Sequence, residues 1–290
     1  MSIQTVTATK SSPRTGQRAV ERTYKAMPTS DGAGVKLNRV IGRPGLPDLD
    51  PFLLLDEFHS EDGADYIAGF PDHPHRGFET VTYMLAGRMR HGDNKGNVGL
   101  LGPGSVQWMT AGRGIVHSEM PEQEDGLMQG FQLWVNLPAK DKMTAPRYQD
   151  IDPKDIPSLT LENGVTVKVI AGEVGGTKGA VDTGVTEPTY LDVVLPKGAS
   201  FTHGIKQGHN AFVYVYDGSA SVGDHALMKT ELGILTDGDN VEIVAGKDGA
   251  RALIVAGKPL GEPVARHGPF VMNTMSEIRQ AAEDYLAGKF

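Results

Sequence analysis

The sequence predicts an all-β fold in two domains, followed by one short helix at the C-terminal end. Its 290 residues are enough for one large or two medium domains, each with its own core. The 37 glycines and 18 prolines supply the many turns that short strands require. Short runs that alternate apolar and polar residues, such as residues 35–40, are typical of half-buried strands.

Composition and charge exclude several classes of protein. The formal net charge of -8 disfavours unaided binding to nucleic acid or to an anionic membrane, because both require clustered Lys and Arg. The chain contains no cysteine, which excludes disulfides, thiolate ligands, iron–sulfur clusters and cysteine nucleophiles. No apolar run has the length of a membrane span or the form of a signal peptide. A cytoplasmic location is therefore expected.

The first half begins with a polar segment, residues 1–34, which is rich in Ser, Thr and Lys and is predicted to be a flexible or loosely packed N-terminal extension. An N-terminal domain is predicted to follow at residues 35–145. Its acidic pair Asp56 and Glu57 interrupts an apolar run and is interpreted as a solvated strand end. The strands predicted in this domain include residues 35–40, 52–58, 79–85 and 130–137.

Four residues with metal-binding side chains stand in two pairs in this half, His73-x-His75 and His117-x-Glu119. Residues two apart in a strand point to the same face, so two neighbouring strands could aim all four at one ion. Three imidazoles and one carboxylate favour Fe, Mn, Ni, Cu or Zn over Mg or Ca. Nine histidines can produce one such pair by chance, but the repeat of the spacing in a second strand-like run indicates a metal site.

A connection is predicted at residues 138–157, which carry charges and prolines with little periodicity. The C-terminal domain is placed at residues 146–290. Asn-Gly and Asp-Gly pairs supply turns between its short strands. These strands are predicted at residues 165–171, 190–195, 211–216, 219–222, 232–235, 241–244 and 252–255.

An internal repeat relates the two halves, because residues 79–87 are similar to residues 210–218. At the same offset, the first histidine pair falls on Gly204 and Lys206. The second copy therefore keeps the strand and turn but loses the ligands, and it is expected to hold no metal. Two other histidines lie nearby without a partner two residues away and are interpreted as structural or surface residues: His203 and His209.

The C-terminal end is predicted to be helical. Thr274-Met275-Ser276-Glu277 has the pattern of a capping box, and apolar residues then recur at helical spacing until Gly288. The apolar stripe of this helix is expected to pack against one of the sheets.

Two ligand pairs on strands separated by glycine turns are the layout of cupins, and the chain from Val35 onward resembles the pirin family of two-domain cupins. Residues 1–34 fall outside the resemblance. The segments that carry it are IGRP (41–44), LDPFLLLDEF (49–58), HPHRGFET (73–80), QWMTAGRGIVHSE (107–119) and GPFVMNT (268–274).

The resemblance implies two tandem cupin domains, each a double-stranded β-helix or jelly roll, with one metal ion in the N-terminal domain. Family members bind iron at the positions matching His73, His75, His117 and Glu119. The resemblance thus implies Fe(II) as the cofactor, with Mn, Ni, Cu and Zn as other candidates. The pirin pattern makes Glu119 the carboxylate ligand, whereas many cupins use the glutamate at the position of Glu79. Glu79 is expected to lie behind the ligands or to pair with Arg76, itself interpreted as a surface charge.

Two classes of function follow from the resemblance. Some bacterial members cleave flavonols such as quercetin with dioxygen, as a quercetin 2,3-dioxygenase does. In that hypothesis a flavonol, or a similar aromatic molecule, is the substrate, and Glu119 is the catalytic residue that accepts its hydroxyl proton. Other members act as iron-dependent transcriptional or metabolic regulators through protein partners. The alternative hypothesis is therefore a regulatory protein without turnover.

Overall fold

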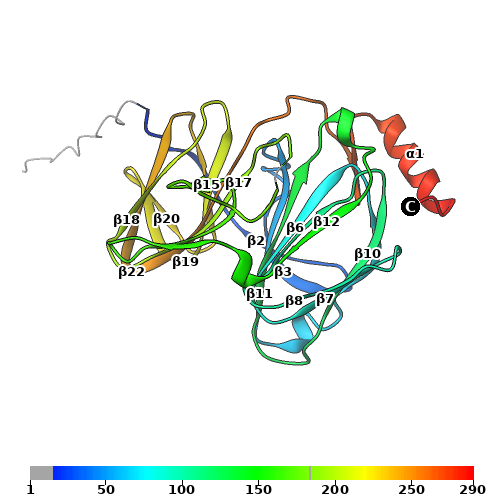
Figure 1. Cartoon of the computed structure of the whole chain (residues 1–290), viewed down its shortest axis with the longest axis horizontal. Coiled ribbons are helices and arrows are strands. Elements are labelled where there is room, and N and C mark those ends of the chain that lie inside the picture. Colours follow the sequence, from blue (N-terminus) through cyan, green and yellow to red (C-terminus); the bar gives the residue numbers. More distant parts are fainter. Residues whose placement is uncertain (1–15, 183) are drawn as a thin grey trace, which may run out of the picture.

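The computed structural model describes residues 16–182 and 184–290 and consists of two β-domains side by side with one α-helix (Figure 1). The predicted all-β class with a terminal helix is confirmed. Seven strands form the large sheet of the N-terminal domain, in the order β12-β9-β6-β11-β4-β3-β2. They are β2 (Met27–Asp31), β3 (Val35–Ile41), β4 (Phe52–Ser60), β6 (Phe78–Ala86), β9 (Val106–Thr110), β11 (Met128–Asn136) and β12 (Arg147–Ile151).

A smaller sheet completes the N-terminal domain, in the order β5-β10-β7-β8. Its strands are β5 (Phe70–His75), β7 (Met89–Asp93), β8 (Val98–Leu101) and β10 (Ile115–Pro121). Three short 3₁₀ helices lie in the connections of the chain: η1 (Gly63–Asp65), η2 (Ala139–Asp141) and η3 (Pro153–Asp155).

The C-terminal domain repeats this plan with the order β1-β21-β19-β22-β17-β14-β13, while β18 pairs with β22 and β20 pairs with β19. Its two longest strands, β19 and β22, pair with each other over most of their length. The strands are β1 (Val20–Lys25), β13 (Ser158–Thr160), β14 (Thr166–Ala171), β17 (Thr189–Leu195), β18 (Ser200–Gly204), β19 (Asn210–Val222), β20 (His225–Met228), β21 (Glu231–Leu235) and β22 (Asn240–Gly257). Two small hairpins are formed by β15 (Glu173–Val174) with β16 (Thr177–Lys178) and by β23 (Ala265–His267) with β24 (Phe270–Met272).

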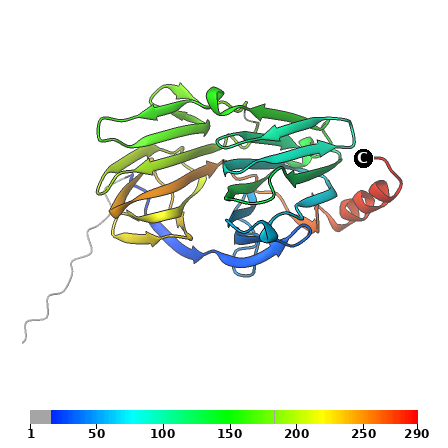
Figure 2. The same cartoon turned by 90° about the horizontal axis from the view of Figure 1, so that it is seen from below.

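Part of the predicted N-terminal extension is ordered, which corrects the expectation that residues 1–34 are flexible or loosely packed. Strand β1 pairs with β21 of the C-terminal domain, and β2 pairs with β3 of the N-terminal domain. The early segment, blue in Figure 2, thus runs along both domains. Both strands expose most of their side chains and are held by backbone hydrogen bonds, so they carry no apolar pattern that a sequence could reveal. Residues 1–15 lie outside the described residues.

The predicted division between the domains at residue 145 stays a prediction. Strand β12 follows it and pairs with β9 of the N-terminal domain, whereas β13 pairs with β14 of the C-terminal domain. Within the described residues, no helix is both long and apolar enough to cross a membrane. The cytoplasmic location likewise stays a prediction.

The last segment of the chain returns to the N-terminal domain, where α1 (Met275–Leu286) lies at the end farthest from the C-terminal domain (Figure 2). The predicted capping box is present, with Thr274 and Glu277 exchanging hydrogen bonds. The apolar face of the helix packs with Phe290 and Val116, as expected for a packing face against a sheet. Arg76 corrects the surface interpretation, because it is buried and pairs with Asp284 of the helix at 2.9 Å.

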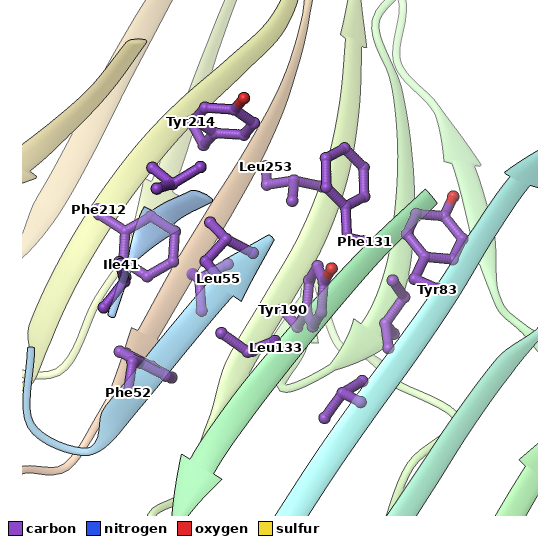
Figure 3. Packing of buried hydrophobic residues seen from close by; sticks show 14 of the residues in the cluster. Ile41, Phe52, Leu55, Tyr83, Phe131, Leu133, Tyr190, Phe212, Tyr214 and Leu253 are labelled. Atoms are coloured by element: carbon purple, nitrogen blue, oxygen red, sulfur yellow. The ribbon is translucent and has the colours of Figure 1, made fainter. Parts of the chain in front are cut away.

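The large sheets of the two domains pack face to face through a shared aromatic core (Figure 3). Tyr83 of β6 donates a hydrogen bond to Asp192 of β17 at 2.6 Å, and Tyr214 of β19 donates one to Glu57 of β4. Glu57 and Asp56 are buried, which corrects their interpretation as a solvated strand end. Each buried carboxylate is tolerated because it has a hydrogen-bonding partner, which is Arg39 of the neighbouring strand for Asp56 and Tyr214 of the other domain for Glu57.

Candidate metal centre

Strands β5 and β10 bring the predicted histidines together. They pair so that His117 lies opposite His73 and Ile115 lies opposite His75. One ligand nitrogen from each of His73, His75 and His117 lies within 4.8 Å of the others. Gly77 lies between β5 and β6 with a φ of 90°, and a Cβ at this position would lie 2.0 Å from the Val271 carbonyl oxygen. Only glycine can therefore make the turn that leads from the histidines into β6.

Each of the three imidazoles has one nitrogen engaged and one nitrogen available. His73 Nδ1 lies 2.8 Å from the Pro71 carbonyl oxygen, and His117 Nδ1 lies 2.9 Å from Nε2 of His91. The backbone of Pro269 hydrogen-bonds His75. By contrast, His75 Nδ1 and His117 Nε2 are buried without any hydrogen-bond partner. Buried nitrogens are rarely left unpaired, and a metal ion bound by both would satisfy them. The site therefore fits a transition-metal ion.

The electrostatics of the site also suit a metal. Burial lowers the pKa of His75 and of His117 well below the ordinary value, and the neighbouring histidines lower both further. Burial also lowers the pKa of His91. These imidazoles are therefore neutral near pH 7, which is the form that offers a lone pair to a metal.

Glu119 lies near the three histidines but not in the same tight group within the described part of the chain. It is buried on β10, and its Oε1 lies 3.0 Å from the Thr82 hydroxyl. The same hydroxyl lies 2.6 Å from the Gln132 side-chain amide. Since a hydroxyl donates one hydrogen, the network closes when Gln132 turns its NH₂ group toward Thr82 and Thr82 donates to Glu119. The role of Glu119 as a fourth ligand stays a prediction.

Glu79 is turned away from the histidines. Its Oε1 accepts a hydrogen bond from the Thr110 hydroxyl at 2.6 Å, and burial raises its pKa. The expected pair with Arg76 does not form, because Arg76 is engaged by Asp284. Sequence reasoning missed His91, which β7 places opposite Glu119 and in contact with His117. Only the strand register could have revealed it, since His91 belongs to no His-x-His pair.

A cavity of about 580 Å³ opens beside the histidines. Its volume lies within the range of small-molecule sites. His73, His75 and Glu119 belong to its lining, together with Thr82, Gln132 and Trp134. Its apolar wall consists of Leu37, Leu54, Phe58, Phe70 and Met89. Charged residues form another part of the lining: Asp31, Arg39, Asp56, Asp72 and Arg266.

The second domain places its own histidines differently. His203 is buried on β18 and stacks on Phe201, with ring centroids 6.2 Å apart. His209 is buried in the loop before β19. Among the described residues, neither belongs to a group that could hold a metal ion.

Comparisons with known proteins agree with this geometry. The family model described as Pirin matches residues 34–135, and the model described as Pirin C-terminal cupin domain matches residues 190–290. A pirin-like protein of Caulobacter vibrioides is 52% identical over 94% of this chain and 99% of its own length. Pirin of Homo sapiens is 48% identical over 90% of this chain and 89% of its own. The crystal structure of quercetin 2,3-dioxygenase from Acinetobacter baumannii matches with a TM-score of 0.87 and 36% identity, over 94% of this chain and 98% of that one.

Proposed function

The chain belongs to the pirin family and has its two cupin domains, and from that premise we propose that it is an iron-dependent dioxygenase that cleaves flavonols such as quercetin. One observation carries the proposal: three imidazoles with available nitrogens converge beside a cavity of about 580 Å³. The crystal structure of quercetin 2,3-dioxygenase that the chain resembles supports the substrate class.

We assign His73, His75 and His117 as ligands, with Glu119 as the fourth. Fe(II) is the metal that we propose, and Mn, Ni, Cu and Zn suit the same donors. Bound iron would supply the chelation of a hydroxyl and its neighbouring carbonyl, together with the redox chemistry with dioxygen.

The protein's own groups would bind and orient the substrate. Glu119 would accept the proton of the flavonol hydroxyl, and the hydrogen bond from Thr82 would hold the carboxylate in place. Trp134 belongs to the cavity wall, and its indole would contact a planar ring there. The apolar side chains of Leu54 and Phe58 line the remaining space and would keep water away from a bound substrate.

An oxygen-dependent assay tests the proposal. Iron-loaded protein is incubated with quercetin in air and under anaerobic conditions, and loss of the flavonol and release of carbon monoxide are measured. We expect turnover in air only, and none in His117→Ala. His203→Ala is the matched control, because it removes a buried histidine of the other domain. Absence of turnover in the iron-loaded wild-type protein would overturn the enzyme proposal and favour the regulatory alternative.

A further inference from the structure

Arg266 reaches the cavity from the C-terminal segment of the chain. It lies on β23, which the returning chain places against the N-terminal domain. Its guanidinium carbon lies 4.8 Å from the centre of the Trp134 ring, and its Nη1 donates a hydrogen bond to the Leu53 carbonyl oxygen at 3.1 Å. These two contacts fix the guanidinium in the cavity lining.

Three carboxylates attract Arg266, namely Asp31, Asp48 and Asp56, and the two that belong to the cavity lining, Asp31 and Asp56, are already engaged. Arg39 binds both oxygens of Asp56, at 2.9 and 2.7 Å, and also binds Asp31 at 2.6 Å. The lining holds two further carboxylates: Asp72 is exposed to solvent, and Glu119 accepts the hydrogen bond from Thr82. Among the residues that the structure describes, Arg266 is the one cation of the lining that forms no ion pair.

Arg266 is therefore a half-buried cation without an ion-pair partner. Burial lowers its pKa, and the guanidinium of Arg39 lowers it further, which outweighs the attraction of the neighbouring carboxylates. An arginine has five N–H donors, and an anion that entered the cavity would meet those left over by the bond to Leu53. Such an anion would form a charge-assisted hydrogen bond, which is stronger than a neutral one.

Trp134 is in contact with both Arg266 and the metal ligand His75. Its ring centre is 5.2 Å from the centre of the His75 ring and 4.8 Å from the guanidinium carbon of Arg266. The distance from the guanidinium carbon to the centre of the His75 ring is therefore at most the sum of these two distances. A planar molecule of two or three fused or linked rings spans such a length.

We propose that the cavity selects aromatic substrates that carry an anionic group, a carboxylate or an ionised phenol, at the end opposite the chelating oxygens, and that Arg266 binds this group. The inference rests on the proposed function and names its substrate class. It makes Arg266 a specificity residue supplied by the C-terminal segment, while the chelating oxygens approach the three histidines and the rings lie along Trp134.

A matched pair of ligands tests the proposal without turnover. The probes are 6,7-dihydroxynaphthalene-2-carboxylate and its neutral carboxamide, both of which carry a chelating diol. Their dissociation constants are measured anaerobically on iron-loaded protein by quenching of tryptophan fluorescence. We expect the wild-type protein to bind the carboxylate about tenfold more tightly or better. We expect Arg266→Gln to lose this preference and Arg266→Lys to keep part of it.

Two controls separate the possible causes. Arg90→Gln removes an exposed arginine that pairs with Glu122, and it should keep the full preference. Iron content and the unfolding temperature show whether Arg266→Gln still folds and binds metal. If it does not, Arg266→Lys serves as the test, because it keeps a positive charge and should retain part of the preference. Equal affinity of the wild-type protein for the two probes would overturn the inference, as would a preference that Arg266→Gln retains. The binding measurements involve no turnover, whereas the quercetin assay measures turnover. Failure of the proposed function is therefore distinguished from failure of this inference.

Discussion

The two domains have the same arrangement of strands but different interiors. Central strand β6 corresponds to β19, and β11 corresponds to the second part of β22. In both domains, alternate residues of these strands face the shared aromatic core. The other face of β19 carries Ala211, Val213 and Val215, which fill the C-terminal domain. The other faces of β6 and β11 carry Thr82, Gln132 and Trp134, which line the cavity.

The same contrast holds for the strands that carry the ligands. In the N-terminal domain, β5 and β10 place His73 opposite His117. In the C-terminal domain, β18 and β22 place Phe201 opposite Ile243, and both belong to its apolar core. The same arrangement of strands thus supports either a filled core or a cavity with metal donors, and the difference lies in the side chains that point inward.

The largest effect is expected from replacing a metal ligand, because the ligands distinguish the N-terminal domain from the C-terminal domain. We expect wild-type protein to bind one iron per chain and His75→Ala to lose essentially all of it, because removing a ligand should cost more than the roughly 100-fold loss that follows removal of a ligand's hydrogen-bond partner. Elemental analysis after dialysis measures the metal content. His203→Ala should keep the full amount. A second equivalent of iron in the wild-type protein that disappears in His203→Ala would contradict the assignment of the site to one domain.

A smaller effect is expected from His91, which supports a ligand without being one. Its Nε2 lies 2.9 Å from Nδ1 of His117, so it can hold His117 in the tautomer whose Nε2 binds metal. We expect His91→Phe to weaken iron binding by about 10- to 100-fold. Competition with a chelator measures the affinity. Tyr148→Phe, which alters a neighbour of His91 but keeps the imidazole, is the control, and an equal loss in that variant would argue against the role of His91.

The sequence predicted the all-β class, most strand positions and the three histidines, because these features are local and repeat at the period of a strand. It could not predict features that depend on distant partners. Asp56 and Glu57 are buried because Arg39 of the neighbouring strand β3 and Tyr214 of the other domain bind them. Arg76 is buried because α1 returns to cover it. Strand β1 was missed because an edge strand held by its backbone needs no apolar pattern.

Two substitutions exchange the inward-facing residue types of the two domains: Val213→Thr on β19 and Thr82→Val on β6. Val213→Thr should lower the free energy of unfolding by about 1–3 kcal/mol, because it buries a hydroxyl in an apolar core. Thr82→Val should lower the free energy of unfolding by about 1–3 kcal/mol, because the buried Glu119 loses its hydrogen bond, and it should also lower quercetin turnover. Urea unfolding and the oxygen-dependent assay measure the two quantities. The contrast fails if Thr82→Val leaves turnover unchanged or if Val213→Thr is as stable as the wild-type protein.

The smallest expected effect is a change of stability with pH. It concerns two buried cations, each of which holds a segment of the chain that crosses from one domain to the other. Arg18 fixes the chain before β1 by donating to the carbonyl oxygens of Gly238 and His209, among others. Lys142 donates to the carbonyl oxygens of Gly77 and Val271 and thereby holds the returning C-terminal segment. Burial lowers the pKa of Lys142 to about 8, from the ordinary 10.5, whereas an arginine stays charged throughout this range.

Only the attachment at Lys142 should therefore respond to pH between 8 and 10.5. In this window the unfolded chain binds more protons than the folded one, so the contribution of Lys142 to the free energy of unfolding rises with pH and is flat below pH 8. The rise should reach about 1 kcal/mol by pH 9. Urea unfolding at pH 7.5 and 9 measures it. Lys142→Met should lose the rise, and the exposed Lys140→Met should keep it, as should Arg18→Met. A rise that persists in Lys142→Met would show that another group titrates in this range of pH and would contradict the role of Lys142.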